Sequence, residues 1–338
     1  MHLKFVEIFC DVALRRSFSK GAAANDISQS AASQAVLAIE RRLGTTLIDR
    51  SKRPLELTPA GQVYLDGCRD VLQDYRALED QVRQLDDRVA GTVRVAAIYS
   101  VGLMQMESYT RRFAELYPDT QVHLEYLHPD QVYAQVLGDE ADIGLVSFPR
   151  PNGELVSVDW QKQPMVLVVP PGHKLAHRNG HRVRAEELSG LGYVGFTHDL
   201  AIRREVDRWF KRARVVVNVK REFDNIENIK RAIEAGSGVA VLPEPTAKQE
   251  VAAGSLVAVK FSDVSWFRPL GIIHKRNKQL TQVVRKLIEL LHADPAAFPK
   301  PNGASAGAAF VRPAVRNRNG AAVRRRAAAT GSKASKRA

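Results

Sequence analysis

The first segment of the chain carries apolar residues at helical spacing, with polar residues between them. These apolar positions predict a first helix, and they are Leu3, Phe5, Val6, Phe9, Val12 and Ala13. Ser19 is a candidate N-cap for a short second helix through residues 22–24, since its hydroxyl can accept a hydrogen bond from a free backbone N–H. Asn25 and Asp26 tolerate turn geometry, so we expect the second helix to end there.

A third helix follows, and its two ends are marked by single residues. Ser28 is predicted to cap its start, and Gly44 lies just past its end. Its predicted inner face consists of Ala32, Val36, Ile39 and Leu43. Its outward residues near the start are Gln29, Ser30, Ser33 and Gln34, with the small Ala31 among them. Two short helices joined by a tight turn are typical of a helix-turn-helix. The second helix bears small polar side chains that can bond base edges, so the sequence predicts that this unit binds double-stranded DNA.

The residues after the third helix predict a basic hairpin. Two short extended runs within residues 46–58 flank Arg50, Ser51, Lys52 and Arg53. Basic side chains beside a major-groove helix would contact phosphates, which supplies affinity and register without sequence preference. Charge runs are also common on solvated surfaces, and this second interpretation applies to Arg41, Arg42, Lys52 and Arg53.

Residues 59–89 form one uninterrupted helical pattern with a single apolar stripe. The stripe consists of Tyr64, Cys68, Val71, Tyr75, Leu78, Val82, Leu85 and Val89, spaced alternately by four and three. Thr58 is predicted to cap this helix, and Pro59 suits its first turn. A straight helix of about 46 Å outruns a small domain, so we expect the stripe to pair with a second copy of the chain. Packing on the chain's own core is the alternative.

Residues 91–293 alternate apolar extended runs with helical patterns. The predicted strands are 92–98, 122–126, 143–146, 165–169, 193–196, 215–219, 238–242 and 270–273. The predicted helices are 104–116, 202–210, 226–235 and 280–291. This order is typical of an α/β domain with a largely parallel sheet. Its length suits two lobes with a ligand cleft between them.

The composition argues against several classes of protein. No apolar run reaches about 18 residues, so we expect neither a membrane span nor a membrane partner. An early acidic residue and the lack of a small-residue cleavage site argue against a signal peptide. Two cysteines, Cys10 and Cys68, cannot build a disulfide framework or a zinc site. Together these observations favour the reducing cytoplasm.

Enzyme motifs are missing from the pattern as well. The histidines are scattered, and the sequence has no G-x-S-x-G turn and no phosphate-cradling glycine run. Residues 236–238, Gly-Ser-Gly, lack the rest of a dinucleotide fingerprint. We therefore expect no enzyme, no cofactor and no metal site. A plain solute-binding protein is also disfavoured, because it would need a secretion signal and no DNA-binding segment.

The net charge of +13 is unevenly distributed. Residues 296–338 contain ten Lys and Arg residues and no Asp or Glu, so they account for +10 and leave +3 for the rest of the chain. An argument from charge to nucleic acid must therefore be local. Few large apolar groups occur in this tail, so we expect disorder. It is either a spacer or an arm that adds sequence-independent, salt-dependent affinity for DNA.

Several motifs occur together in an order that is typical of one protein family. In the N-terminal part they are Ser17-Phe18-Ser19 with Ala22-Ala23, Ser28-Gln29-Ser30-Ala31-Ala32-Ser33, Leu43-Gly44-Thr45-Thr46-Leu47-Ile48-Asp49-Arg50, and Leu57-Thr58-Pro59-Ala60-Gly61. In the distal part they are Asp142-Ile143-Gly144-Leu145, Asp224-Asn225-Ile226-Glu227 and residues 236–243. On these residues the chain resembles a LysR-type transcriptional regulator over nearly all of residues 2–293.

The resemblance implies a domain order and a set of partners. It implies a winged helix-turn-helix over residues 1–58, a dimerising linker helix over 59–90, and a two-lobe α/β effector domain, similar to periplasmic binding proteins, over 91–295. The basic tail, 296–338, lies outside the family pattern. The family further implies a homotetramer, or at least a homodimer, that binds an operator and regulates transcription in response to a small molecule. RNA polymerase is an additional candidate partner.

The resemblance also assigns candidate site residues. For DNA they are Ser28, Gln29, Ser30, Ser33, Gln34, Arg50, Lys52 and Arg53. For the effector they are Tyr99, Ser100, Val101, His128, Ser147, Phe148, Phe196 and Thr197. Ser100 and the backbone N–H groups of a helix N-terminus would suit a carboxylate or another anion. Plainer interpretations remain: Ser100 only caps its helix, His128 is solvated, and Phe196 belongs to the core.

A few residues depart from the family pattern. The family usually has Arg where Gln34 stands, and polar or charged residues where Leu37 and Ala38 stand. Gln34 can still bond a base or a phosphate, but a fixed positive charge is missing, so operator preference is expected to differ. Lys20 and Gly21 are also unusual, and glycine lowers the intrinsic stability of the short second helix.

Overall fold

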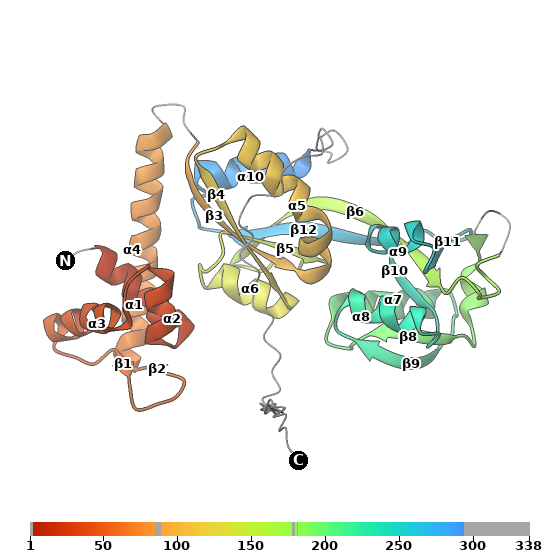
Figure 1. Cartoon of the computed structure of the whole chain (residues 1–338), viewed down its shortest axis with the longest axis horizontal. Coiled ribbons are helices and arrows are strands. Elements are labelled where there is room, and N and C mark those ends of the chain that lie inside the picture. Colours follow the sequence, from red (N-terminus) through yellow and green to blue (C-terminus); the bar gives the residue numbers. More distant parts are fainter. Residues whose placement is uncertain (1–2, 85–88, 178–179, 181, 294–338) are drawn as a thin grey trace, which may run out of the picture. The chain divides into compact units, whose positions relative to one another are not determined.

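The computed structural model of the chain describes residues 3–84, 89–177, 180 and 182–293 (Figure 1). The tail from residue 296, for which the sequence predicts disorder, lies outside the described residues. Within the described ranges, no helix has both the length and the apolar character that crossing a membrane would require.

Three helices build the N-terminal head, which here means residues 3–58. They are α1 (Leu3–Arg15), α2 (Phe18–Ala24) and α3 (Gln29–Leu43). The predicted caps of α3 are confirmed: the Ser28 hydroxyl accepts from the backbone N–H of Ala31 at 3.2 Å, and Gly44 has the left-handed φ of 65° that ends the helix. The predicted cap of α2 is wrong. Ser17, whose backbone is extended, accepts from the Lys20 N–H, and Ser19 lies inside the helix.

Two further residues of the head differ from the sequence-based expectation. Leu43 was expected on the inner face of α3, yet it is 42% exposed, because the buried face of α3 ends at Ile39 and Glu40. Gly21 has a packing role: a Cβ at this position would lie 2.7 Å from the Cα of Val12. Glycine therefore allows α2 to approach the backbone of α1, which offsets its low helix propensity.

A short wing connects the head to the linker helix. Strands β1 (Ile48–Asp49) and β2 (Glu56–Leu57) pair antiparallel, as the predicted hairpin requires. The Thr58 hydroxyl accepts from the Gly61 N–H at 3.0 Å and donates to the Thr46 carbonyl at 2.7 Å. A Cβ on Gly61 would lie 1.9 Å from the Leu47 carbonyl oxygen. Gly61 thus lets the first turn of the helix pack directly on the wing.

The linker helix α4 runs from Pro59 to Gln84 and divides the predicted stripe. Near its start, Leu65, Cys68 and Leu72 are buried in the core of the head. Further along, the side chains of Val71, Tyr75, Leu78 and Val82 are exposed. Leu85 lies outside the described residues. Val89 follows the helix instead of belonging to it, and it packs against the core of the next domain. Each of the two interpretations of the stripe therefore fits part of it.

The first lobe of the α/β domain is built on a parallel arrangement of three strands. These are β3 (Gly91–Ile98), β4 (Thr120–Leu127) and β5 (Ile143–Ser147), with β3 pairing parallel to both others. The helices of this lobe are α5 (Tyr99–Leu116), α6 (Pro129–Leu137) and α10 (Gln282–His292). The predicted strands here are confirmed, while α6 was not predicted and α5 begins five residues earlier than expected.

The second lobe has its own core. Its strands are β7 (Arg182–Val183), β8 (Gly192–Phe196), β9 (Asn218–Phe223), β10 (Ala240–Pro243) and β11 (Val257–Phe261). Its helices are α7 (Ala201–Arg212), α8 (Ile226–Glu234) and α9 (Lys248–Ala252), with short 3-10 turns at Ala185–Leu188 and Glu244–Ala247. The strand predicted at 215–219 is displaced. Val215 enters the lobe's core as part of a loop, and pairing with β8 begins only at Asn218.

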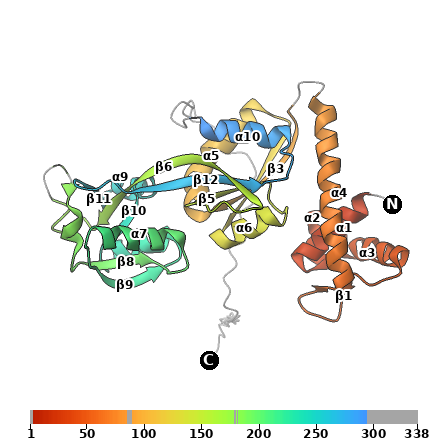
Figure 2. The same cartoon turned by 180° about the vertical axis from the view of Figure 1, so that it is seen from behind.

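Two long strands, β6 (Leu155–Val169) and β12 (Phe267–Lys275), connect the lobes. They pair antiparallel from Leu155–Lys275 to Pro164–Phe267, and β6 then continues between β10 and β11. Figure 1 and Figure 2 show this pair running side by side from two opposite directions of view. The largest sheet has the order β4-β3-β5-β12-β6-β11-β7. Because β6, β10 and β12 pair antiparallel, the predicted largely parallel sheet is in fact mixed.

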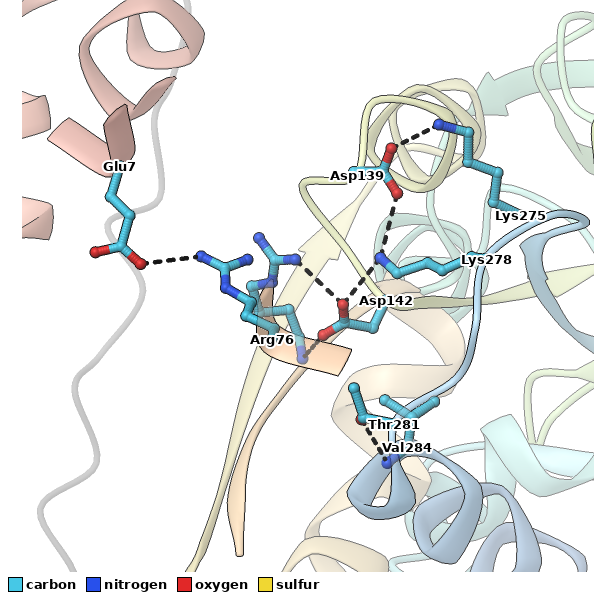
Figure 3. Close-up of polar contacts among 9 residues, drawn as sticks. Glu7, Arg76, Asp139, Asp142, Lys275, Lys278, Thr281 and Val284 are labelled. Carbon is cyan, nitrogen blue, oxygen red and sulfur yellow. Dashed lines mark hydrogen bonds and ion pairs between the residues drawn. The ribbon is translucent and has the colours of Figure 1, made fainter. Parts of the chain in front are cut away.

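A charge cluster secures the first lobe at the start of β5. The Asp142 carboxylate accepts from the backbone N–H of Arg94 at 2.8 Å and contacts its guanidinium at 3.1 Å. Lys278 bridges Asp142 and Asp139 at 3.1 and 3.2 Å, and Lys275 contacts Asp139 at 2.6 Å (Figure 3). Burial by itself raises the pKa of Asp142, but the charges of Arg94 and Lys278 outweigh it and lower this pKa to about 2.

Candidate DNA-contact surface and effector pocket

The start of α3 presents a polar face to solvent. Ser28, Gln29, Ser30 and Gln34 are exposed, and Ser33 is half-buried. The Ser28 hydroxyl serves as the cap and lies 2.9 Å from the Ser30 hydroxyl. The amides of Gln29 and Gln34 can donate and accept at once, which is the chemistry that reads adenine in a major groove. The structure thus brings the predicted base-reading residues onto one exposed helix face.

The predicted phosphate-binding residues of the wing differ in their surroundings. Lys52 and Arg53 are exposed between β1 and β2. Arg50 is held in place: its guanidinium lies 2.8 Å from the Glu40 carboxylate, 3.3 Å from the Ser33 hydroxyl and 5.1 Å from the centre of the Phe18 ring. Lys52 and Arg53 are therefore the wing cations that are free to meet a phosphate, whereas Arg50 ties the wing to α3.

Glu40 completes this connection, and sequence reasoning missed it. Its second carboxylate oxygen accepts from the backbone N–H groups of Leu47 and Ile48, at 2.9 and 3.2 Å. One buried carboxylate therefore satisfies two backbone donors at the start of the wing and one guanidinium at its turn. The available signal was an acid at position 40, four residues after Val36 and three before Leu43, on the predicted apolar side of the helix.

The α/β domain contains a cavity of about 440 Å³ where strand ends from both lobes meet. Four strands deliver their carboxyl ends to it, namely β3, β4, β5 and β8, and the helices α5, α6, α7 and α8 begin at it. Ligands of α/β proteins bind at such carboxyl ends, because helix N-termini and loops converge there. The volume is within the range of small-molecule sites.

Most of the predicted effector residues line this cavity. Those that do are Tyr99, Ser100, His128, Ser147, Phe148 and Phe196. Val101 lies outside it, because its side chain is turned from α5 into the fully buried core of the first lobe. Thr197 also lies outside the lining, in the turn that leads from β8 towards α7. Apolar contact surface comes from Ile98, Leu127, Leu200, Ile202 and Ile226, none of which was predicted.

The most informative residue of the cavity is Arg268, which sequence reasoning missed. It lies on β12 opposite Gln163 of β6, where the two strands pass between the lobes, and it is only 1% exposed. Its Nη1 donates to the Ser100 hydroxyl at 2.9 Å, and its Nε donates to the Gln163 amide oxygen at 3.0 Å, with Nη2 bonded to the same oxygen. These acceptors are all neutral, and in the described part of the chain no carboxylate pairs with Arg268.

Burial lowers the pKa of Arg268 to about 9, because the guanidinium has left water without gaining a counter-ion. The group is still charged at neutral pH. An unpaired charge in this position is costly, and an anion that entered the cavity would neutralise it. The N-terminus of the eighteen-residue helix α5, at Tyr99 and Ser100, adds a positive end dipole beside it. The inner end of the cavity is therefore suited to an oxyanion.

The two lobes also meet across the cavity through side chains. His128, which precedes α6, lies 3.2 Å from the carboxylate of Asp199, which precedes α7. Phe196 is fixed on the other side, since its carbonyl accepts from the Arg203 guanidinium at 2.6 Å. His128 is therefore paired and not simply solvated, and Phe196 belongs to both the core and the cavity wall.

Most of the chain matches two models of one protein family. Residues 3–62 match the family model for the bacterial regulatory helix-turn-helix protein of the lysR family, and residues 86–296 match that for the LysR substrate binding domain. The regulator YeiE of Escherichia coli, itself described as uncharacterized, is 25% identical over 298 residues, which covers 88% of this chain and 99% of YeiE.

Solved structures show the same fold. Full-length OxyR C199D from Pseudomonas aeruginosa is similar with a TM-score of 0.67 and 20% identity, over 86% of this chain and 93% of that one. Full-length CbnR in complex with its target DNA is similar with a TM-score of 0.58 and 20% identity, over 86% of this chain and 99% of that one. Both the head and the two-lobe domain therefore have counterparts in complete regulators.

Proposed function

Because the chain belongs to the LysR family of transcriptional regulators, we propose that a small organic acid, bound in its cavity, controls its action at an operator. The chain carries both domains of the family, a DNA-binding head and an effector-binding domain, and it is a DNA-binding regulator that responds to a small molecule. We propose both the charged group of this effector and the residues that hold it.

The observation that carries the proposal is the buried, unpaired guanidinium of Arg268. A carboxylate at the inner end of the cavity would accept from Arg268 and from the Ser100 hydroxyl, which now bond each other at 2.9 Å. Charge-assisted bonds of this kind are about twice as strong as neutral ones. The rest of the ligand would lie on the apolar wall formed by Phe148, Phe196 and their neighbours. An acid with an apolar body fits this division better than a polyol or a cation.

A differential scanning experiment with matched pairs of ligands tests the class. Full-length protein is heated with benzoate and with benzamide, and with other short carboxylates and their amides, each at millimolar concentration. A ligand that binds the folded state raises Tm by mass action. We expect a carboxylate to raise Tm and its amide to have no effect. Equal shifts for an acid and its amide would mean that the charge is not recognised.

On the DNA side, we propose that Gln29, Ser30 and Gln34 contact base edges and that Lys52 and Arg53 contact phosphates. Their exposure on one surface of the head supports this division. Ser28 and Ser33 are proposed to act at the margin of the same surface. Arg50 is proposed to position the wing through Glu40, so its effect on DNA binding would be indirect.

The partners follow from the family and from α4. Regulators of this family bind operators and form oligomers. We propose that the exposed stripe of Val71, Tyr75, Leu78 and Val82 pairs α4 with a second copy, and that two such dimers form a tetramer. RNA polymerase is proposed as a further partner and the cytoplasm as the location, because a regulator that binds an operator acts where that DNA is transcribed.

A further inference from the structure

The two cysteines of the chain lie together where the head packs on α4, outside the surfaces discussed so far. Cys10 belongs to α1 and Cys68 to α4, and these are the only cysteines in the sequence. Both are in the same buried cluster, 6% and 7% exposed, and their thiols are hydrogen-bonded to each other. The chain thus places its two nucleophilic sulfur atoms in contact.

The packing of α1 against α4 holds this contact. The rings of Phe9 and Tyr64 meet edge to face with 5.2 Å between their centres. Phe9 precedes Cys10, and Tyr64 lies one helical turn before Cys68. Further along α4, Arg76 contacts Glu7 of α1 at 3.6 Å (Figure 3). Contacts on both sides of the thiols hold α1 against α4, so the two cysteines stay together in one buried cluster.

The surroundings make the two thiols chemically unequal. The Cys10 thiol and the Tyr64 hydroxyl both hydrogen-bond the Cys68 sulfur, and Arg42, 3.5 Å from the Tyr64 hydroxyl, adds positive charge. These contacts lower the pKa of Cys68 to about 7, whereas the bond to Cys68 and burial raise the pKa of Cys10. Of the two thiols, Cys68 is therefore the one that loses its proton first. An attacking thiolate beside a resolving thiol is the arrangement found in thiol redox sites.

We propose that Cys10 and Cys68 form a two-thiol oxidation site, at which a hydroperoxide converts the pair into an intramolecular disulfide between α1 and α4. This site is separate from the effector cavity. Residues 91–295 contain no cysteine, so thiol chemistry in this chain can arise only in the head and the linker helix.

The reaction balances with one hydroperoxide molecule. The Cys68 thiolate attacks the outer oxygen of the peroxide, the O–O bond breaks, and the alkoxide or hydroxide leaves with a proton from solvent. Cys68 is now a sulfenic acid, oxidised by two electrons. The Cys10 sulfur then attacks the Cys68 sulfur, the S–O bond breaks, and hydroxide leaves with the Cys10 proton as water. Two thiols and one hydroperoxide give one disulfide, one alcohol or water, and one water.

The test uses reduced full-length protein treated with a small excess of hydrogen peroxide at neutral pH. Remaining thiols are alkylated, and the digest is analysed by mass spectrometry. We expect a cross-linked peptide pair containing Cys10 and Cys68, lighter than the two free peptides by two hydrogen atoms. In the untreated protein, we expect Cys68 to be alkylated faster than the equally buried Cys10, since its pKa is the lower of the two.

Single-cysteine variants separate the two roles. Cys10→Ser should leave a sulfenic acid on Cys68 that dimedone traps, and Cys68→Ser should leave Cys10 reduced under the same treatment. Cys10→Ala and Cys68→Ala keep the core apolar and repeat the test if a serine hydroxyl unfolds the head. The proposal is overturned if the wild type forms no Cys10–Cys68 link, if a covalent dimer forms instead on a non-reducing gel, or if Cys10 oxidises equally well without Cys68.

Discussion

The guanidinium of Arg50 lies 2.8 Å from the carboxylate of Glu40, and this pair joins the wing to α3 from inside the head. Glu40 also accepts from two backbone N–H groups of the wing. The position of the basic hairpin relative to α3 is therefore set by a buried acid. The residues proposed to face DNA depend on this pair for their placement.

Removal of the Glu40 carboxylate is expected to destabilise the head. Glu40→Ala leaves two backbone donors and the Arg50 guanidinium without their acceptor, which costs about 1–3 kcal/mol for the buried donors. Urea unfolding followed by circular dichroism measures the loss. Glu56→Ala is the matched control, because Glu56 forms only a half-exposed pair with Arg16 at 3.6 Å and should change stability by less than about 1 kcal/mol. Equal losses in the two variants would contradict a central role for Glu40.

Lys52 and Arg50 are expected to affect DNA binding in different ways. Lys52→Gln removes a proposed phosphate contact, so the slope of log affinity against log salt should fall by about one while stability stays unchanged. Arg50→Gln should instead lower the free energy of unfolding, since the Glu40 charge loses its partner. Fluorescence anisotropy with a labelled duplex over a range of salt concentrations gives the slopes. A reduced slope in Arg50→Gln at unchanged stability would make Arg50 a direct phosphate ligand.

The exposed stripe of α4 is expected to hold two copies together. Leu78 is 56% exposed, and Leu78→Asp would place a carboxylate in an apolar helix pair, which should weaken self-association at least about a hundredfold. Val63→Asp is the control, because Val63 is 76% exposed on the same helix but is not part of the stripe. Analytical ultracentrifugation should show a smaller assembly for the first variant only. An assembly of unchanged size after Leu78→Asp would place the interface elsewhere.

Asp142 is expected to contribute stability that depends on pH. Its pKa in the folded chain is about 2, below the ordinary 3.8, so its contribution is fully present above about pH 4 and is lost as the pH falls towards 2. The difference corresponds to about 2 kcal/mol. Asp142→Asn should therefore lower the free energy of unfolding at neutral pH, and the gap to the wild type should close in acid.

Urea titrations at a series of pH values test this expectation. Glu289→Gln serves as control, because Glu289 is exposed and contacts only the neighbouring turn of its own helix. A constant gap between wild type and Asp142→Asn across the acid range would show that the lost interaction is not the ionic one.

Local signals in the sequence predicted the elements whose ends are set locally. Ser28 and Gly44 mark α3 because capping involves residues within one turn. The same logic assigned the cap of α2 to Ser19, although Ser17 was two residues away and equally able to accept the bond. The strand expected at 215–219 was displaced because a run of valines has no feature that sets register, which comes from pairing with β8.

The cavity was only half predictable for a similar reason. Ser100, His128 and Phe196 follow predicted strands, so their convergence could be expected from the order of the elements. Arg268 could not be expected, because it stands between Phe267 and a proline in a segment with no distinctive motif. Its partner Gln163 is far away in the sequence, and only the pairing of β12 with β6 brings the two together.

The proposal that the effector is an anion depends on Arg268 more than on any other residue. Arg268→Gln keeps polar atoms beside Gln163 and Ser100 but removes the charge. Arg208→Gln is the matched control, since Arg208 is exposed on α7 and pairs with Glu205 outside the cavity lining. Both variants should bind the same DNA duplex as the wild type in the absence of acid, which shows that the head is intact.

The most direct test is isothermal titration of these variants with the carboxylate that raises the wild-type Tm most. Loss of a buried charged partner costs at least about 2 kcal/mol, so Arg268→Gln should bind that acid at least about thirtyfold more weakly, while Arg208→Gln binds it as the wild type does. Unchanged affinity in Arg268→Gln would contradict the account.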